Sequence, residues 1–187
     1  SPTIRRVAVR ALGRLQRHAL LDSISPALVD ADARVRLEGV NAVGQAMQGA
    51  RALAGGSPER RALLDEAVEL VVRTAERFPD PQLLGVAART LGRLPYADSV
   101  VPREAERVIV EMGDRAGSGG RPLVRSDDRV AFGVMHGLYS LARARRATGR
   151  PSERALAAMR WGTTFGLEEP FGARPSPAAA GAEGGSR

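Results

Sequence analysis

The chain has 187 residues, of which 43% are hydrophobic, 26% charged and 4% aromatic, and it contains no cysteine. This length and apolar share suit one folded domain and exclude disorder through most of the chain. The lack of cysteine excludes disulfides and thiolate metal sites, and no run reaches the roughly 18 uncharged apolar residues of a membrane span.

The net charge of +7 comes from the two ends of the chain. All 28 basic residues are arginine; residues 1–20 hold five arginines and no acid, whereas residues 21–120 hold 12 arginines against 15 acids. Arginine without lysine is what GC-rich coding produces, so this excess does not by itself indicate nucleic-acid binding. The chain starts at Ser1 without an initiator methionine, and we expect it to be a piece of a longer protein. The sequence favours a cytoplasmic location but does not exclude export.

One apolar pattern recurs along the chain and predicts a helix at each recurrence. Apolar or small side chains follow the first residue of a copy at offsets of 3, 4, 7, 8 and 11, which form one stripe along an α-helix; Glu38, at offset 3 of the second copy, is an exception. The copies start at Ile4, Val35, Leu83 and, less regularly, Asp128, and predict helices over 4–15, 35–46, 83–94 and 127–146. No segment alternates with period two, so we expect no strands.

Three glycines, Gly13, Gly44 and Gly92, occupy the same offset in their copies. Glycine inside a helix costs roughly 1 kcal/mol relative to alanine. Its recurrence at one place therefore predicts that a neighbouring helix approaches the backbone closely there.

A second helix is expected after each copy. These helices are predicted over 19–29, where Pro26 should bend or end the helix, over 58–77, over 102–112 and after Ser152. Caps support these limits: Ser1-Pro2, Ser57-Pro58 and Asp80-Pro81 each combine an N-cap residue with proline at the first helical position, and Ser126 or Asp127 can cap the helix over 127–146.

The alternating helices predict an all-α fold, an α-solenoid of stacked antiparallel helical hairpins. Each hairpin is too small to bury its apolar stripe alone, but stacked hairpins can bury it. The array is expected over 1–167, with a flexible insertion over 113–125. Residues 168–187 are rich in Ala, Gly, Pro and Ser and are expected to form a disordered tail or linker.

Several short motifs resemble HEAT repeats, particularly the short bacterial HEAT-like type. They are Ile4-Arg5 and Val35-Arg36 near helix starts, the turn Asp30-Ala31-Asp32, and Leu12-Gly13 and Leu91-Gly92. The resemblance implies about four HEAT-like repeats, with a structural ladder between Asp and Arg of neighbouring repeats. The third copy has Leu83-Leu84 in place of Val-Arg, which leaves its ladder contact open.

No motif predicts a catalytic, cofactor or metal site. The glycine-rich segment 113–120 lacks the Lys-Ser/Thr of a phosphate loop, and neither His18 nor His136 has a second ligand at helical spacing. Repeats without a convergent polar cluster favour a non-catalytic scaffold that binds a protein or another domain of the same chain. The expected contacts are polar positions of the long second helices: Asp65, Glu69, Arg73, Arg103 and Glu111.

Two alternatives stay open. The segment 121–160 holds nine arginines against three acids and predicts nucleic-acid binding through Arg143, Arg145, Arg146 and Arg150. The acidic second helices argue against it, since the segments 58–77 and 98–113 carry six arginines against nine acids. The other alternative, implied by the resemblance alone, is the scaffold region of a larger enzyme such as a cyclophilin-type peptidyl-prolyl isomerase; whether the segment itself has activity is left open.

Overall fold

The computed structural model describes residues 1–96, 101–144 and 151–164, and these residues are almost entirely helical. The only β-type pairing among them is an isolated bridge between Ala116 and Pro122. The predicted all-α class is confirmed. None of the described helices is long and apolar enough to cross a membrane.

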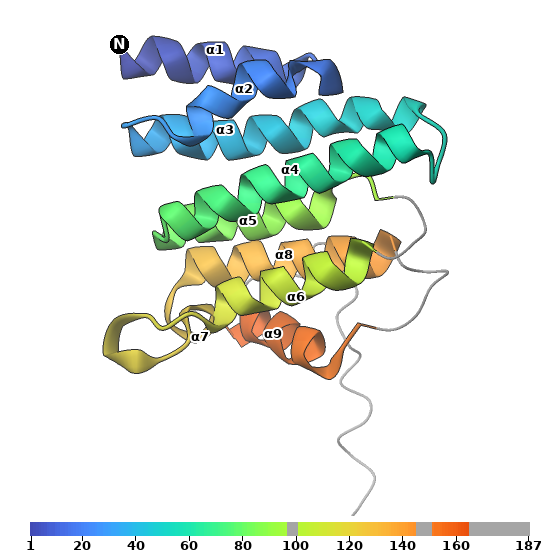
Figure 1. Ribbon diagram of the computed structural model, residues 1–187. Coiled ribbons are helices and arrows are strands. Elements are labelled where there is room, and N and C mark those ends of the chain that lie inside the picture. Colours follow the sequence, from blue (N-terminus) through green and yellow to red (C-terminus); the bar gives the residue numbers. More distant parts are fainter. Residues whose placement is uncertain (97–100, 145–150, 165–187) are drawn as a thin grey trace, which may run out of the picture.

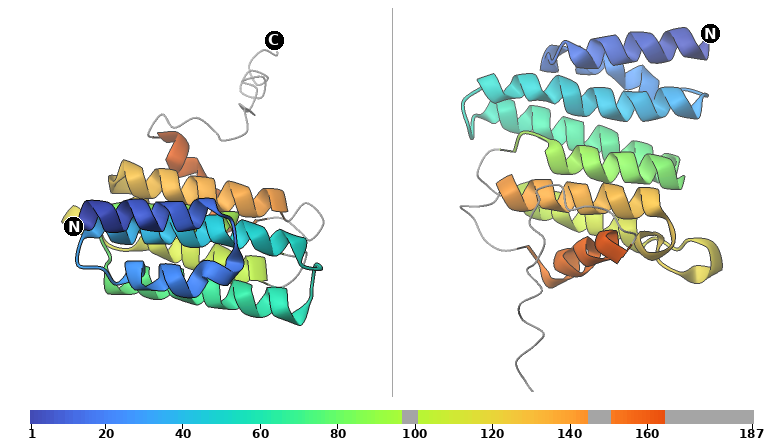
Figure 2. Two further views of the ribbon diagram at one scale, coloured as in Figure 1. Left: turned by 90° about the horizontal axis from the view of Figure 1, so that it is seen from above. Right: turned by 180° about the vertical axis from the view of Figure 1, so that it is seen from behind.

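The helices alternate between two rows. The first row holds α1 (Pro2–Arg14), α3 (Ala33–Ala46), α5 (Pro81–Arg93) and α8 (Asp128–Ala144). The second row holds α2 (Leu21–Leu28), α4 (Pro58–Arg77) and α6 (Val101–Asp114). Each first-row helix packs on the next, and each second-row helix packs on the first row (Figure 1). Figure 2, right, shows the molecule from behind, with the helices of the first row in front.

Two further helices close the C-terminal end of the described chain. The short α7 (Leu123–Ser126) packs against α6 and α8, and α9 (Glu153–Thr164) crosses obliquely beneath α8 and α6 (Figure 1). Arg154 of α9 pairs with Asp114 of α6 at 2.5 Å. The core therefore runs without interruption from the first hairpin to α9.

Side chains cap most helix starts, at the predicted residues and also at Asp32, which was not predicted as a cap. A backbone N–H two or three residues on donates to the side-chain oxygen of Asp32, Ser57, Asp80, Asp127 and Ser152. Ser1 occupies the N-cap position of α1 and Pro2 the first helical position, as predicted, but the Ser1 side chain accepts no capping hydrogen bond. Pro26 lies inside α2, which continues to Leu28, so it does not end that helix.

The recurring glycines lie where successive first-row helices meet, which confirms the predicted close approach. A Cβ atom on Gly13 would lie 2.8 Å from the Cα of Ala42. On Gly92 it would lie 2.1 Å from the carbonyl oxygen of Gly137, far inside van der Waals contact. At Gly13 and Gly92 glycine is required because the helix backbones themselves touch, whereas the nearest atom at Gly44 is the side-chain Cγ2 of Thr90.

The apolar stripe is buried in every first-row helix except α1. Val35 of α3 and Leu83 of α5 are each 1% exposed, whereas Ile4, at the same offset, is 70% exposed. Val7 and Leu15 of α1 are exposed as well. A first-row helix covers this stripe in α3 and α5, but none of the described residues covers it in α1.

Arg5 joins the first hairpin to the next one. Its Nε and Nη2 donate to the two carboxylate oxygens of Asp30 at 2.6 and 2.8 Å, which is the contact the resemblance implies. At the same offset in the next copy, Arg36 donates to the carbonyl oxygens of Asp30 and Ala31 and lies over the ring of Phe78. An aromatic ring thus replaces the carboxylate at the second junction.

The segment 113–125, predicted as a flexible insertion, carries regular local structure. Gly117 N–H donates to Arg121 O and Leu123 N–H to Arg115 O, each at 2.8 Å. Leu123 and Val124 are buried in the main core. These contacts fold the end of the segment back onto α6; its flexibility stays a prediction.

Candidate protein-binding groove

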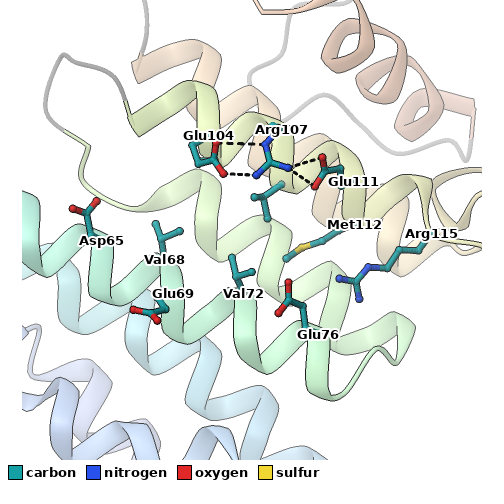
Figure 3. Close-up of a pocket in the computed structure, with 12 residues that line it drawn as sticks. Asp65, Val68, Glu69, Val72, Glu76, Glu104, Arg107, Glu111, Met112 and Arg115 are labelled. Atoms are coloured by element: carbon teal, nitrogen blue, oxygen red, sulfur yellow. Dashed lines mark hydrogen bonds and ion pairs between the residues drawn. The ribbon is translucent and has the colours of Figure 1, made fainter.

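A groove of about 510 Å³ lies between the second-row helices α4 and α6. Its floor is apolar and is formed by Val68, Val72, Ala105, Val108 and Met112. Carboxylates follow both edges: Asp65, Glu69 and Glu76 from α4, and Glu104 and Glu111 from α6 (Figure 3). We call this feature the α4–α6 groove.

Helical spacing accounts for this arrangement on each side. On α4, Val68 and Val72 are one turn apart, and Glu69 and Glu76 lie two turns apart beside them. Residues three or four apart share a helix face, so the valines share the floor and the carboxylates share the edge. The pattern on α6 is equivalent, with Glu104 and Glu111 two turns apart.

Arg107 organises the charges on the α6 edge. Its guanidinium lies between the carboxylates of Glu104 and Glu111 and hydrogen-bonds to both, with Nη1 2.7 Å from Glu111 Oε1 (Figure 3). The hydrogen bond from Arg107 lowers the pKa of Glu104 below its ordinary value. On the α4 edge, Arg73 pairs with Glu69. These exposed pairs hold the carboxylates in place and contribute little to stability.

The groove keeps a net negative charge despite these pairs. Five carboxylates line it against two guanidiniums, those of Arg107 and Arg115. Arg115 Nη1 donates to the carbonyl oxygen of Ala75 at 3.0 Å and so ties the end of α6 to the end of α4. The groove therefore offers an apolar surface between two acidic edges, and it is closed at one end by Arg115.

The structure brings some of the predicted contact residues together and separates others. Asp65, Glu69 and Glu111 all line the groove. Arg73 lies beside it through its ion pair with Glu69, whereas Arg103 is exposed on α6 and does not line it.

Sequence reasoning missed the other half of the groove. Glu76, Glu104, Arg107 and the floor valines were not among the predicted contacts. The spacing of Glu104, Arg107 and Glu111 at i, i+3 and i+7 marks one polar helix edge and was the available signal. Which helix α6 would face could not be read from that spacing.

A second, basic surface lies on the first row. Two adjoining hollows of about 310 and 530 Å³ share Gln48 and Arg93 and have no acidic residue in their lining. Of the arginines predicted to bind nucleic acid, Arg143 lines the larger hollow, whereas Arg145, Arg146 and Arg150 lie outside the described residues.

Within the described ranges, no three His, Asp or Glu side chains are grouped as metal ligands would be. Comparison of the chain with protein-family models, with curated proteins and with solved structures found no match.

Proposed function

We propose that this chain is an α-solenoid of about four HEAT-like repeats that acts as a non-catalytic scaffold for protein binding. The α4–α6 groove receives a helical segment of a protein partner or of another domain of the same chain. The observation that carries this proposal is the apolar floor of Val68, Val72 and Val108 between two acidic edges.

The repeat arrangement is supported by glycine contacts that recur between successive first-row helices; the first two are in register, and the partner in the third lies two residues further along its copy. Gly13 meets Ala42, Gly44 meets Thr90 and Gly92 meets Gly137. Ala42 and Thr90 hold the same offset in their copies as Ala11 does in the first, and Ala11 is exposed. In α3 and α5 the face that carries this offset packs against another first-row helix, and in α1 the equivalent face is exposed. This equivalence supports stacked repeats, in which each repeat contacts its neighbours through the same faces.

The groove specifies the chemistry of its partner. An amphipathic helix binds such a groove by placing apolar side chains at i, i+3 or i+4 and i+7 on the floor. The acidic edges favour lysine or arginine on both flanks of that apolar stripe and disfavour glutamate or aspartate. We therefore propose a basic amphipathic helix as the ligand.

Two synthetic helical peptides with the same leucine spacing test this proposal. One carries lysine and arginine on its flanks and the other carries glutamate, and binding is measured by fluorescence anisotropy. We expect the basic peptide to bind and the acidic peptide not to bind. Equal binding of both peptides, or binding of neither, would contradict the proposal.

A pair of double variants on α4 locates the binding site. Asp65→Arg with Glu76→Arg reverses two charges on the groove edge, and we expect it to weaken the basic peptide at least about tenfold. Glu59→Arg with Glu66→Arg makes the same charge change on exposed positions of α4 outside the groove lining. This control should leave the affinity nearly unchanged; an equal loss would show a long-range charge effect and remove the groove from the proposal.

A further inference from the structure

The basic surface of the first row contains arginines whose charge the described residues do not balance. Arg14, Arg89 and Arg93 line the smaller hollow with the amide side chains of Asn41 and Gln45. None of these three arginines forms an ion pair with a described carboxylate.

Two other arginines of the first row have carboxylate partners, whereas Arg36 donates to backbone carbonyl oxygens. Arg10 of α1 donates to Glu38 of α3 at 2.7 Å, and Arg5 pairs with Asp30. The hollow therefore differs from the Arg5 and Arg10 contacts in having no carboxylate beside its arginines.

Arg89 and Arg93 lie one helical turn apart on α5 and so place two like charges side by side. Arg89 is half-buried, and its Nη2 donates to Asn41 Oδ1 at 3.2 Å, a neutral partner. Burial and the Arg93 guanidinium lower the pKa of Arg89, although arginine stays charged at any physiological pH. Like charges at this spacing repel each other, and an anion bound between the two guanidiniums would offset this repulsion.

Arg60 shows the contrasting case. It lines the larger hollow, but its guanidinium donates to the carbonyl oxygens of Pro95, at 2.7 Å, and Leu53. Its hydrogen-bonding groups are used to hold α4 against the end of α5, so we assign Arg60 a structural role.

We propose that the smaller hollow binds a phosphate group, held by the guanidiniums of Arg89 and Arg93, with Arg14 lining the same hollow. Guanidinium groups bind phosphate through paired N–H donors, and several of them match a multiply charged anion better than a single carboxylate. The volume of about 310 Å³ accommodates a phosphate group with part of the molecule that carries it. This site is separate from the α4–α6 groove and does not depend on the function proposed for that groove.

The two histidines of the chain give a direct readout of binding. Burial and the charges of Arg89 and Arg93 lower the pKa of His136 of α8. An anion bound by these two arginines should therefore raise the pKa of His136. His18, at the start of a short 3-10 turn, is not among the residues that line the hollow and serves as the internal reference. In an NMR titration with pyrophosphate at constant ionic strength, we expect the imidazole signals of His136 to move and its pKa to rise, while those of His18 stay fixed.

Arginine-to-glutamine variants locate the site. Arg93→Gln, at an exposed position, should weaken pyrophosphate binding at least about tenfold, and Arg89→Gln should do the same if the variant folds. Arg61→Gln removes one charge from an exposed position of α4 and is the matched control. Absence of binding, or an equal loss in Arg61→Gln, would overturn the proposal.

A single-stranded oligonucleotide distinguishes the two sources of the phosphate. If the ligand is a free phosphate compound, pyrophosphate binds at least as tightly as the oligonucleotide, and Arg51→Gln in the adjoining hollow has no effect. If the ligand is a nucleic-acid backbone, the oligonucleotide binds more tightly, its affinity falls steeply with salt, and Arg51→Gln weakens it too. Either result supports the phosphate site, provided that Arg93→Gln weakens binding.

Discussion

The guanidinium carbon of Arg36 lies 4.1 Å from the ring centroid of Phe78, at the junction that corresponds to the Arg5–Asp30 ion pair. Both arginines stand one residue after the start of their copy, and both partners stand five residues before the start of the next copy. The same position thus joins neighbouring hairpins through a carboxylate in one case and through an aromatic ring in the other.

A double-mutant cycle measures the contact between Arg36 and Phe78. We expect Arg36→Gln and Phe78→Leu to show a coupling energy of about 0.5–2 kcal/mol in urea unfolding, as for a partly desolvated cation over a ring. Arg77 also lies over this ring but at 5.4 Å, so the coupling of Arg77→Gln with Phe78→Leu should be smaller. Equal coupling in both cycles would contradict a specific role for Arg36.

The Arg5–Asp30 pair predicts a loss of stability in acid. The hydrogen bonds from Arg5, and then that from the Asp32 amide, lower the pKa of Asp30 from 3.8 to about 2. A carboxyl whose pKa is lowered by folding stabilises the protein above its unfolded pKa, and this contribution is lost as the pH falls from about 4 towards 2. In urea titrations at pH 5, Asp30→Asn should unfold at a lower urea concentration than the unmodified chain. As the pH falls from about 4 towards 2, the free energy of unfolding of Asp30→Asn should fall by less than that of the unmodified chain. Asp22→Asn, at an exposed position of α2, is the control and should follow the unmodified chain.

Equivalent positions in α1 and α3 should respond differently to the same truncation. Val35 is 1% exposed, so Val35→Ala should lower the free energy of unfolding by about 1–3 kcal/mol through lost burial and a small cavity. Ile4 is 70% exposed, and Ile4→Ala should change it by no more than about 0.5 kcal/mol. Urea unfolding of the two variants checks this; a similar large loss for both would show that the face of α1 is covered.

The helix crossing at Gly92 should not tolerate a side chain. In Gly92→Ala the added methyl group meets the backbone of Gly137, which cannot move without separating α5 from α8. We therefore expect the free energy of unfolding to fall by at least about 2 kcal/mol. Gly44→Ala is the comparison, because its nearest atom is the side-chain Cγ2 of Thr90 at 2.8 Å, which can shift more easily. Thermal unfolding should therefore show the larger fall in Tm for Gly92→Ala. The reverse order would argue against backbone contact as the limiting feature.

The sequence by itself determined the longer helices, most of their caps and the glycines at which they cross, but not the short α7, which begins inside the predicted insertion. The segment 58–77 is a helix as predicted, and Asp80 and Asp127 cap the helices that follow them. These features depend on residues within about one turn of each other, through i,i+4 spacing and hydrogen bonds from side chain to backbone, so local sequence carries them. The glycines could be found because their contacts repeat at the same offset.

Only the tertiary structure decided which charges face each other. Glu76 and Glu104 are far apart in the sequence, yet they line one groove, because α4 and α6 both pack on α5 and leave the groove between them. The sequence predicted anion binding at the arginine run that begins at Arg143. Arg89 and Arg93, with which no described carboxylate pairs, lie in α5, a helix that is not rich in arginine. Charge balance depends on distances between helices, and those distances are set by how the apolar stripes pack and not by the spacing of charges along the chain.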